Sequence, residues 1–291
     1  MSLYPYKVFL EIVDQGSFVK ASEKLNLTPS AVSHSLKSLE DEFGFRLFRR
    51  NKTGAILTDE GNRILPYART LVAAEKNLIQ EVELIQDLRI GTVTIGMFSS
   101  VASNWFIKIL QSFKQKNPSI NVVFLQGDYS DIIEWLETGK VDLAFTSDEL
   151  ARGMNFTPLY RDPLICVASG DFVPENGKTV TAADFASNTL IINKECEEYD
   201  AKRYLEDNGI RPDAYYETIM HPTLFSMVEE GMGVCIIPEL VAAESPGGIR
   251  KYPIEGDPYR TIGLSYSESD AISPLSLLIT EEIKNFLENP R

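Results

Sequence analysis

Short polar side chains lie along one face of a helix predicted from Pro29 to about Glu42. At 100° per residue, Ser30, His34 and Lys37 project about 140–200° away from Val32. The opposite, apolar face contains Val32, Leu36, Leu39 and Phe43. Hydroxyl, imidazole and ammonium groups can bond to base edges in the major groove of DNA. The pattern favours a DNA-reading helix, and the alternative is an ordinary helix pair with a polar outer face.

Two neighbouring helices are expected to hold this reading helix. Thr28 offers a hydroxyl N-cap, and Pro29 suits the first helical position. Before them, Phe18, Ala21 and Leu25 recur at helical spacing and predict a short buried helix. A further supporting helix is predicted from Tyr4 to Gln15, with Gly16 as its stop.

A basic hairpin follows the reading helix. The run FRLFRRNKTGAILT alternates apolar and basic residues around a turn at 51–54. It presents Arg49, Arg50 and Lys52, cations that suit phosphate or minor-groove contacts. A solvated charge run is the alternative, and adjacency to the reading helix favours the DNA contact.

One long helix of about 28 residues is predicted after Thr58. Its apolar positions recur in steps of four and three, with one polar interruption, at Ile64, Ala68, Leu71, Glu75, Leu78, Val82 and Ile85. Pro66 should kink or locally restrict this helix. Dimerisation with a second copy is the favoured interpretation, and packing against the second half of the chain is the alternative.

Strands alternate with helices from about residue 89 onward, which predicts an open α/β sheet. The segments WLETGKVDLAF at 135–145 and MVEEGMGVCII at 227–237 share an order of helix, glycine stop and buried strand. This weak repeat predicts two similar lobes. Short strands at Leu164–Ala168 and Thr261–Tyr266 would cross between them, and a C-terminal helix at Leu275–Asn289 would return to the first lobe.

Polar residues follow several of these strands and would face a cleft between the lobes. Helix starts with hydroxyls favour carboxylates or other anions, so a small-molecule effector, anionic in the simplest case, is expected there. Each residue alone is more commonly a cap or turn residue. The candidates are Ser99, Ser100, Thr146, Ser147, Asn193, Lys194, His221 and Thr223.

Charge is distributed unevenly along the 291 residues. The net charge is −14, but residues 1–58 carry eight Lys or Arg against six acidic residues, and the remainder carries 20 against 36. A DNA-contacting end on an acidic body fits this asymmetry. No apolar run of about 18 residues and no signal peptide is visible, so a cytoplasmic protein without membrane contact is expected.

Enzymatic and metal chemistry lack their usual signatures. His34 and His221 are the two histidines, without a cysteine pair nearby for zinc. No nucleophile elbow or phosphate-binding loop is present, so neither an enzyme nor a cofactor is expected. Cys166 and Cys235 lie in apolar runs, and acidic neighbours disfavour a reactive thiolate at Cys196. Redox sensing is therefore not favoured.

The N-terminal stretch GSFVKASEKLNLTPSAVSHSLKSLEDEFGFRLFRR and the following LTDEG resemble the LysR-type transcriptional regulators. The matching positions are Ala21, Leu25, Ala31, Val32, Ser33, Leu39, Glu40, Gly44, Leu47, Phe48, Arg49, Leu57, Thr58 and Gly61. The resemblance in the second half is looser and rests on GKVDLAF and VEEGMGVCIIP. The family often has Gln where this chain has Pro29. Base reading is then left to Ser30, Ser33, His34 and Lys37.

The resemblance implies a winged helix–turn–helix at 1–58, a dimerising linker helix at 59–88 and a periplasmic-binding-protein-like effector domain at 89–291. Lobe I would comprise 89–162 and 267–291, and lobe II 163–266. It further implies tetramers on operator DNA, a co-inducer that alters DNA bending, and RNA polymerase as a candidate partner. The rival hypothesis is a solute-binding or enzymatic protein whose N-terminal domain serves only protein contacts.

Overall fold

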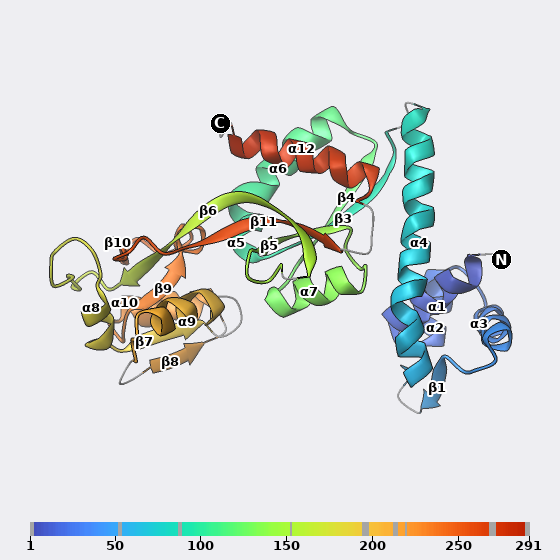
Figure 1. Cartoon of the computed structure of the whole chain (residues 1–291), viewed down its shortest axis with the longest axis horizontal. Coiled ribbons are helices and arrows are strands. Elements are labelled where there is room, and N and C mark those ends of the chain that lie inside the picture. The colour runs from blue at the N-terminus through green and yellow to red at the C-terminus, as the bar shows by residue number, and fades with distance from the viewer. Residues whose placement is uncertain are drawn as a thin grey trace.

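The computed structural model describes residues 3–51, 54–86, 89–151, 153–193, 198–211, 215–218, 220–267 and 272–288. Figure 1 shows an N-terminal helical domain beside one long helix, then two α/β lobes extending away from that helix. The mixed α/β class predicted from the sequence is confirmed.

The N-terminal domain contains α1 (Tyr4–Gln15), α2 (Phe18–Lys24), α3 (Pro29–Phe43) and the hairpin strands β1 (Phe48–Asn51) and β2 (Gly54–Leu57). Local chemistry sets these bounds. Gly16 and Gly44 end α1 and α3 with φ of 60° and 78°, a region that favours glycine. The Thr28 hydroxyl accepts the Ala31 amide at 3.2 Å and caps α3. The predicted helices and hairpin are confirmed.

The long helix α4 (Asp59–Ile85) continues through Pro66. Thr58 caps it by accepting the Gly61 amide at 2.9 Å. Its first turns belong to the N-terminal core, where Ala68 is buried and Ile64 packs beside it. The predicted apolar series therefore divides, because its first residues pack within the chain and its later ones do not.

Lobe I has a sheet in which β3 (Gly91–Met97) pairs in parallel with β4 (Ile120–Gln126) and β5 (Leu143–Ser147). Its helical segments are α5 (Ser99–Val101), the π-helical segment η1 (Ala102–Phe106), α6 (Ile107–Lys116), α7 (Tyr129–Glu137) and α12 (Pro274–Glu288). The helix predicted after Met97 is thus interrupted by a π-helical turn. The C-terminal helix returns to lobe I, as predicted.

Two long antiparallel strands, β6 (Met154–Ala168) and β11 (Tyr259–Ser267), run from lobe I into lobe II (Figure 1). The prediction of a short strand at 164–168 was wrong in its start, because β6 begins ten residues earlier. The added residues include Pro158 and Pro163, and proline has no N–H to donate to a neighbouring strand. The strand tolerates Pro158 where it faces Gly263, at the point where the register shifts.

Lobe II repeats the alternating construction. It contains α8 (Ala182–Ala186), β7 (Leu190–Asn193), α9 (Glu198–Asp207), β8 (Tyr215–Thr218), α10 (His221–Glu229), β9 (Cys235–Pro238), α11 (Glu239–Ala242) and β10 (Arg250–Pro253). Strand β7 pairs in parallel with β8, and a bridge from Leu190 to Val234 links β7 to the chain just before β9. Strands β9 and β10 pair with the second half of β6.

Candidate DNA-binding surface and effector cleft

The polar face of α3 is open to solvent. Ser30, His34 and Lys37 are exposed and Ser33 is half-buried, while Val32, Leu36 and Leu39 are buried against α1 and α2. Thr28 and Pro29 are exposed at the start of the helix, and the Thr28 and Ser30 hydroxyls lie 3.1 Å apart. The helix therefore presents the predicted set of short donors and acceptors on one surface.

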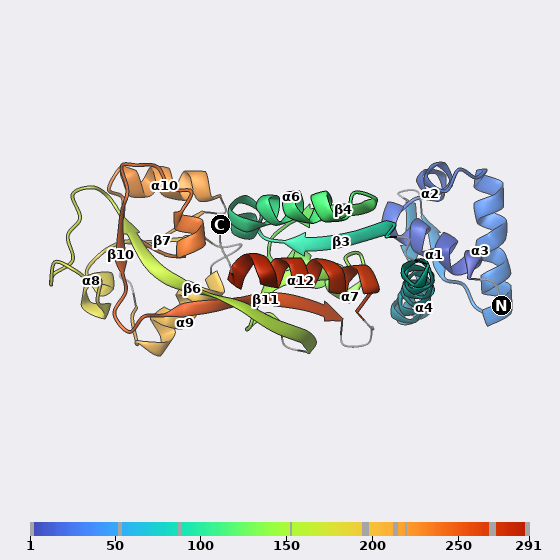
Figure 2. The same ribbon diagram turned by 90° about the horizontal axis from the view of Figure 1, so that it is seen from above.

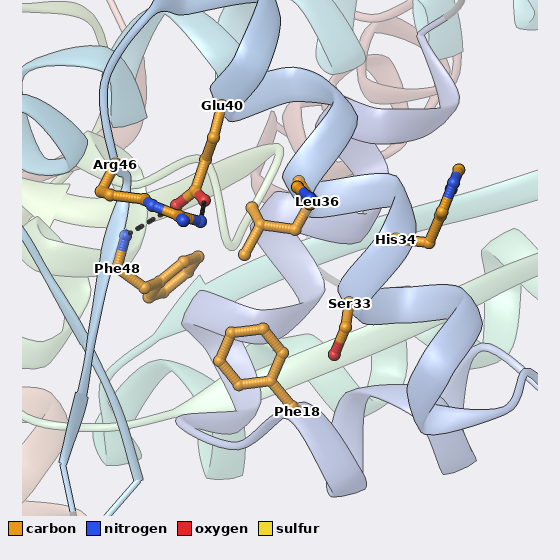
Figure 3. A pocket seen from close by; sticks show the side chains of 8 residues that line it. Phe18, Ser33, His34, Leu36, Glu40, Arg46 and Phe48 are labelled. Carbon is orange, nitrogen blue, oxygen red and sulfur yellow. Dashed lines mark hydrogen bonds and ion pairs between the residues drawn. The ribbon is translucent and has the colours of Figure 1, made fainter.

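A groove of about 540 Å³ lies between α3 and the hairpin (Figure 3). It is lined by Phe18, Ser33, His34, Leu36, Lys37, Glu40, Arg46 and Phe48. In Figure 3 the Arg46 side chain reaches from the chain before β1 toward Glu40 on α3. Side chains of the predicted reading face and a guanidinium that precedes the hairpin thus border one groove.

Buried Glu40 joins the reading helix to the start of the hairpin. Its carboxylate accepts the Leu47 amide at 2.7 Å, the Phe48 amide at 3.4 Å and the Arg46 guanidinium at 2.6 Å. The hydrogen bond from Arg46 to Glu40 and the negative charge of Glu40 raise the pKa of Arg46 above its usual value. Glu40 was expected only as a position of the family pattern, and Arg46 was not expected to have a role. The sequence did contain one sign of the role of Glu40, because this acidic residue lies at the edge of the apolar face of its helix.

Thr58, the N-cap of α4, also binds the backbone of Arg46 and Leu47 through hydrogen bonds. The Thr58 hydroxyl donates to the Arg46 carbonyl at 2.8 Å, and the Thr58 amide donates to the Leu47 carbonyl at 2.9 Å. A Cβ at Gly61 would lie 2.3 Å from the Leu47 carbonyl oxygen, so this position requires glycine. Reading helix, hairpin and α4 therefore meet at one backbone segment.

The hairpin presents Arg49 as an exposed residue of β1, opposite Ile56 of β2. The backbone of Arg50 lies in β1 opposite Ala55. The Arg50 side chain and the whole of Lys52 lie outside the described residues, so their contribution stays a prediction.

The later part of α4 carries an exposed apolar face. Tyr67, Leu71, Leu78, Val82 and Ile85 are 45–75% exposed, and all project within about 40° of Leu71. Glu75, the polar interruption of the predicted series, pairs with Lys7 of α1 at 2.6 Å. We call these five exposed residues the dimer face after the pairing predicted from the sequence, since a contiguous apolar stripe on a long helix is typical of helix pairing.

The predicted effector residues end strands at matching edges of the two lobes. Ser99 and Ser100 follow β3, and Thr146 and Ser147 end the parallel strand β5. In lobe II, Asn193 ends β7, while His221 and Thr223 begin α10 after β8. Asn193 is buried, His221 is half-buried against Phe225, and Thr223 is exposed. The buried Thr146 hydroxyl lies 2.6 Å from that of Ser265 on the crossing strand β11. Lys194 lies outside the described residues.

Arg260 of β11 is buried at the crossing between the lobes and was missed by the sequence analysis. Its guanidinium donates to Asp162 of β6 at 2.7 and 2.9 Å, to the Tyr129 hydroxyl at 2.7 Å and to the Ser100 hydroxyl at 3.2 Å. Asp200 of lobe II lies 3.9 Å away. These neighbours raise the pKa of Arg260, although burial alone would lower it.

Further contacts hold the lobes together beside this cluster. The Asn104 amide donates to the Leu240 carbonyl at 3.0 Å, and the Leu240 amide donates to Asp162 at 3.1 Å. Ser103 of η1 donates to Glu244, just beyond α11. The segment that begins with Ser99 and Ser100 is therefore bound to lobe II through α11.

The described cysteines, Cys166 and Cys235, are buried in lobe II. Burial raises the pKa of the Cys166 thiol, which suppresses its reactive thiolate. Cys196 lies outside the described residues. In the part of the chain that the structure describes, no helix is long and apolar enough to span a membrane.

A winged helix–turn–helix joined by a long helix to a two-lobed binding domain defines a class of ligand-responsive DNA-binding regulators. Residues 5–62 match the family model for the bacterial regulatory helix-turn-helix protein of the LysR family. Residues 86–287 match the model for the LysR substrate binding domain. The chain belongs to the LysR family of transcriptional regulators, and it is a DNA-binding regulator rather than an enzyme.

Curated relatives agree over nearly the whole length. The chain is 28% identical to the uncharacterized HTH-type transcriptional regulator YvbU of Bacillus subtilis over 290 residues, covering 98% of each protein. It is 24% identical to the HTH-type transcriptional regulator IlvY of Escherichia coli, covering 99% of this chain and 95% of that one.

Solved structures share the fold. A full-length OxyR variant from Pseudomonas aeruginosa superposes with a TM-score of 0.80 at 18% identity, covering 98% of this chain and 95% of that one. Full-length CbnR in complex with its target DNA gives a TM-score of 0.63 at 17% identity, covering 99% of this chain and 100% of that one.

Proposed function

We propose that this regulator reads an operator with α3 and holds the adjacent phosphates with its hairpin. Pro29, Ser30, Ser33, His34 and Lys37 would face the major groove, with Thr28 at the helix start. Arg49, Arg50 and Lys52 would contact the backbone. The observation that carries this proposal is the exposure of His34 and Lys37 on the groove between α3 and the hairpin.

In this proposal residues 1–58 bind DNA, residues 59–88 dimerise through the dimer face, and residues 89–291 bind the effector. Lobe I comprises 89–162 and 267–291, and lobe II comprises 163–266. Two dimers would combine as a tetramer on DNA, in the cytoplasm where the chromosome lies. RNA polymerase is a further proposed partner, since a regulator acts on transcription.

The effector would bind between the lobes, near Ser99, Ser100, Thr146, Ser147, Asn193, His221 and Thr223. Because Asp162 already neutralises Arg260, an anionic effector would depend on backbone amides at the starts of α5 and α10. Effector binding would change the bend that the regulator imposes on DNA.

Gel-shift titration against the DNA upstream of the protein's own gene tests the DNA-binding role. Binding should weaken steeply as salt rises, because phosphate contacts release counterions. A complete lack of salt-sensitive binding to such fragments contradicts the proposal. A thermal-shift screen of small carboxylates and amino acids on the full-length protein tests the effector role, since a native-state ligand raises stability.

A further inference from the structure

The face of α4 opposite the dimer face contacts the effector domain. Arg69, Ala73, Lys76 and Gln80 project about 140–200° away from Leu71. Figure 2 looks along α4 and shows the effector domain to one side of this helix. Gln80 is buried and the other three residues are half-buried. One helix can therefore pair with a second copy and still hold its own effector domain.

Lys76 makes the ionic contact on this second face. Its ammonium lies 2.7 and 2.8 Å from the two carboxylate oxygens of Asp142, between α7 and β5. The same carboxylate accepts the Thr94 amide of β3 at 2.7 Å, which fixes its position on lobe I. Gln80 donates to the Thr92 carbonyl at 3.4 Å one turn farther along. These contacts dock α4 on the edge of lobe I.

The internal repeat shows which contacts the Asp142 carboxylate adds to its segment. In lobe I the Asp142 amide donates to the Thr94 carbonyl at 2.8 Å, and in lobe II the Val234 amide donates to the Thr189 carbonyl at 2.9 Å. Asp142 and Val234 occupy the same place after the helix and its glycine. Lobe II accepts a buried valine there. The acidic side chain in lobe I therefore makes two contacts that a valine cannot make, one with the Thr94 amide of its own lobe and one with Lys76 of α4.

The same part of α4 is also fixed to the DNA-binding domain. Glu75, the residue before Lys76, pairs with Lys7 of α1 at 2.6 Å. Arg69, two turns earlier, pairs with Asp14 at the end of α1 at 2.8 Å. Two consecutive residues, Glu75 and Lys76, thus connect α4 to the DNA-binding domain and to lobe I.

We propose that the Lys76–Asp142 pair is the docking contact through which the effector domain sets the orientation of the DNA-binding domain. This proposal rests on the proposed regulatory function. Movement of lobe I displaces Asp142, and Lys76 passes that displacement to α4 and α1. Loss of the pair weakens the docking of lobe I on α4 and leaves the reading helix intact.

Solution scattering on the full-length protein, without DNA or effector, tests the docking. The variants are Lys76→Met, which removes the charge, Lys76→Glu, which repels Asp142, and Lys76→Arg, which keeps the pair. Lys116→Met is the matched control, because Lys116 forms a 2.7 Å pair with Glu282 inside lobe I. Both Lys76 and Lys116 are exposed enough for substitution without unfolding, which circular dichroism checks.

Lys76→Met should populate undocked forms about two- to fivefold more, the range expected for a partly exposed ion pair. The radius of gyration should increase, and Lys76→Glu should increase it further. Lys116→Met and Lys76→Arg should give the wild-type curve. A wild-type curve for Lys76→Glu overturns the docking role.

DNA bending, measured by circular permutation on a fragment that the wild type binds, tests the transmission. Lys76→Glu should change the bend while affinity stays within about twofold of wild type. An altered scattering curve with an unchanged bend overturns transmission. Failure of the wild-type protein to bind DNA overturns the proposed function instead, and the scattering result still decides the docking.

Discussion

Glu40 lies about 80° from Val32, at the edge of the apolar face of α3, and its carboxylate is buried beneath the hairpin. A carboxylate there satisfies backbone amides that the turn after Gly44 would otherwise leave without partners. Thr58 and Gly61 approach the same segment from α4. Three positions of the family pattern therefore have one physical explanation, the fixing of residues 46 and 47 between two helices.

Replacing Glu40 tests that explanation. Glu40→Ala should lower the free energy of unfolding by about 2–3 kcal/mol, because it leaves the Leu47 amide buried without an acceptor. Glu40→Gln keeps an acceptor oxygen and should cost less. Urea unfolding measures both, with exposed Glu42→Ala as the control. Equal stability of Glu40→Ala and the control would contradict the assigned role.

The reading face and the hairpin should respond differently to substitution. Lys37→Ala and His34→Ala should reduce the preference for operator over random DNA, because these side chains face base edges. Arg49→Ala should weaken binding to both sequences alike and reduce the salt slope by about one. Titrations at several salt concentrations measure this. An effect of Arg49→Ala on operator binding alone would contradict its assignment to phosphates.

At the scale of elements, helices with clear caps were predicted closely and strands with prolines were not. Thr28, Gly16 and Gly44 are local signals, since cap chemistry acts within one turn. Strand β6 was predicted only over its last five residues, and its pairing with β11 reveals the full length, which includes Pro158 and Pro163. Rules that consider only neighbouring residues cannot identify a pairing strand about 100 residues away in the sequence.

The same limit applies to the candidate site. The exposed face of α3 follows from spacing alone, and it was predicted residue by residue. The Arg260 cluster brings together Ser100, Tyr129, Asp162 and Asp200, which come from four separate segments of the chain and from both lobes. A lone arginine at the start of a strand gives no sign of those neighbours. The sequence therefore indicated the polar residues at the ends of β3 and β5, but it did not indicate the buried charge of Arg260 beside Ser100.

The dimer face of α4 leads to a prediction about assembly. Leu78 is 66% exposed in the single chain, and a partner helix would cover it. Leu78→Glu should place a charge in that contact and shift the protein toward monomers. Sedimentation velocity measures the shift. Leu277→Glu on α12 is the matched control, since Leu277 is 49% exposed outside the dimer face. Equal dissociation by both variants would exclude a specific role for α4.

At the scale of the whole molecule, the crossing strands β6 and β11 connect the two lobes. They also bury the charged side chain of Arg260 between the lobes. Arg260 on β11 and Asp162 on β6 form the centre, and Ser100, Tyr129 and Asp200 reach it from either lobe. The cluster contains one cation and two carboxylates in a buried place. Because its members come from both lobes, the contacts of this cluster require the present orientation of the lobes.

Removing Arg260 should therefore be far more damaging than removing its exposed neighbour. Arg260→Met leaves Asp162 buried without its cation and should lower the free energy of unfolding by about 3–5 kcal/mol. Arg161→Met is the control, because Arg161 is exposed on β6 and stacks 4.0 Å from the Tyr259 ring.

The double variant Arg260→Met/Asp162→Asn removes both charges of the pair. It should recover part of the lost stability, because Asp162 is then no longer a buried carboxylate without its cation. Urea unfolding of Arg260→Met, Asp162→Asn and the double variant gives the coupling between the two sites. Strictly additive losses would show that the pair does not act as a unit. In that case the lobes would be held by α11 and its contacts with Asn104 and Ser103 instead.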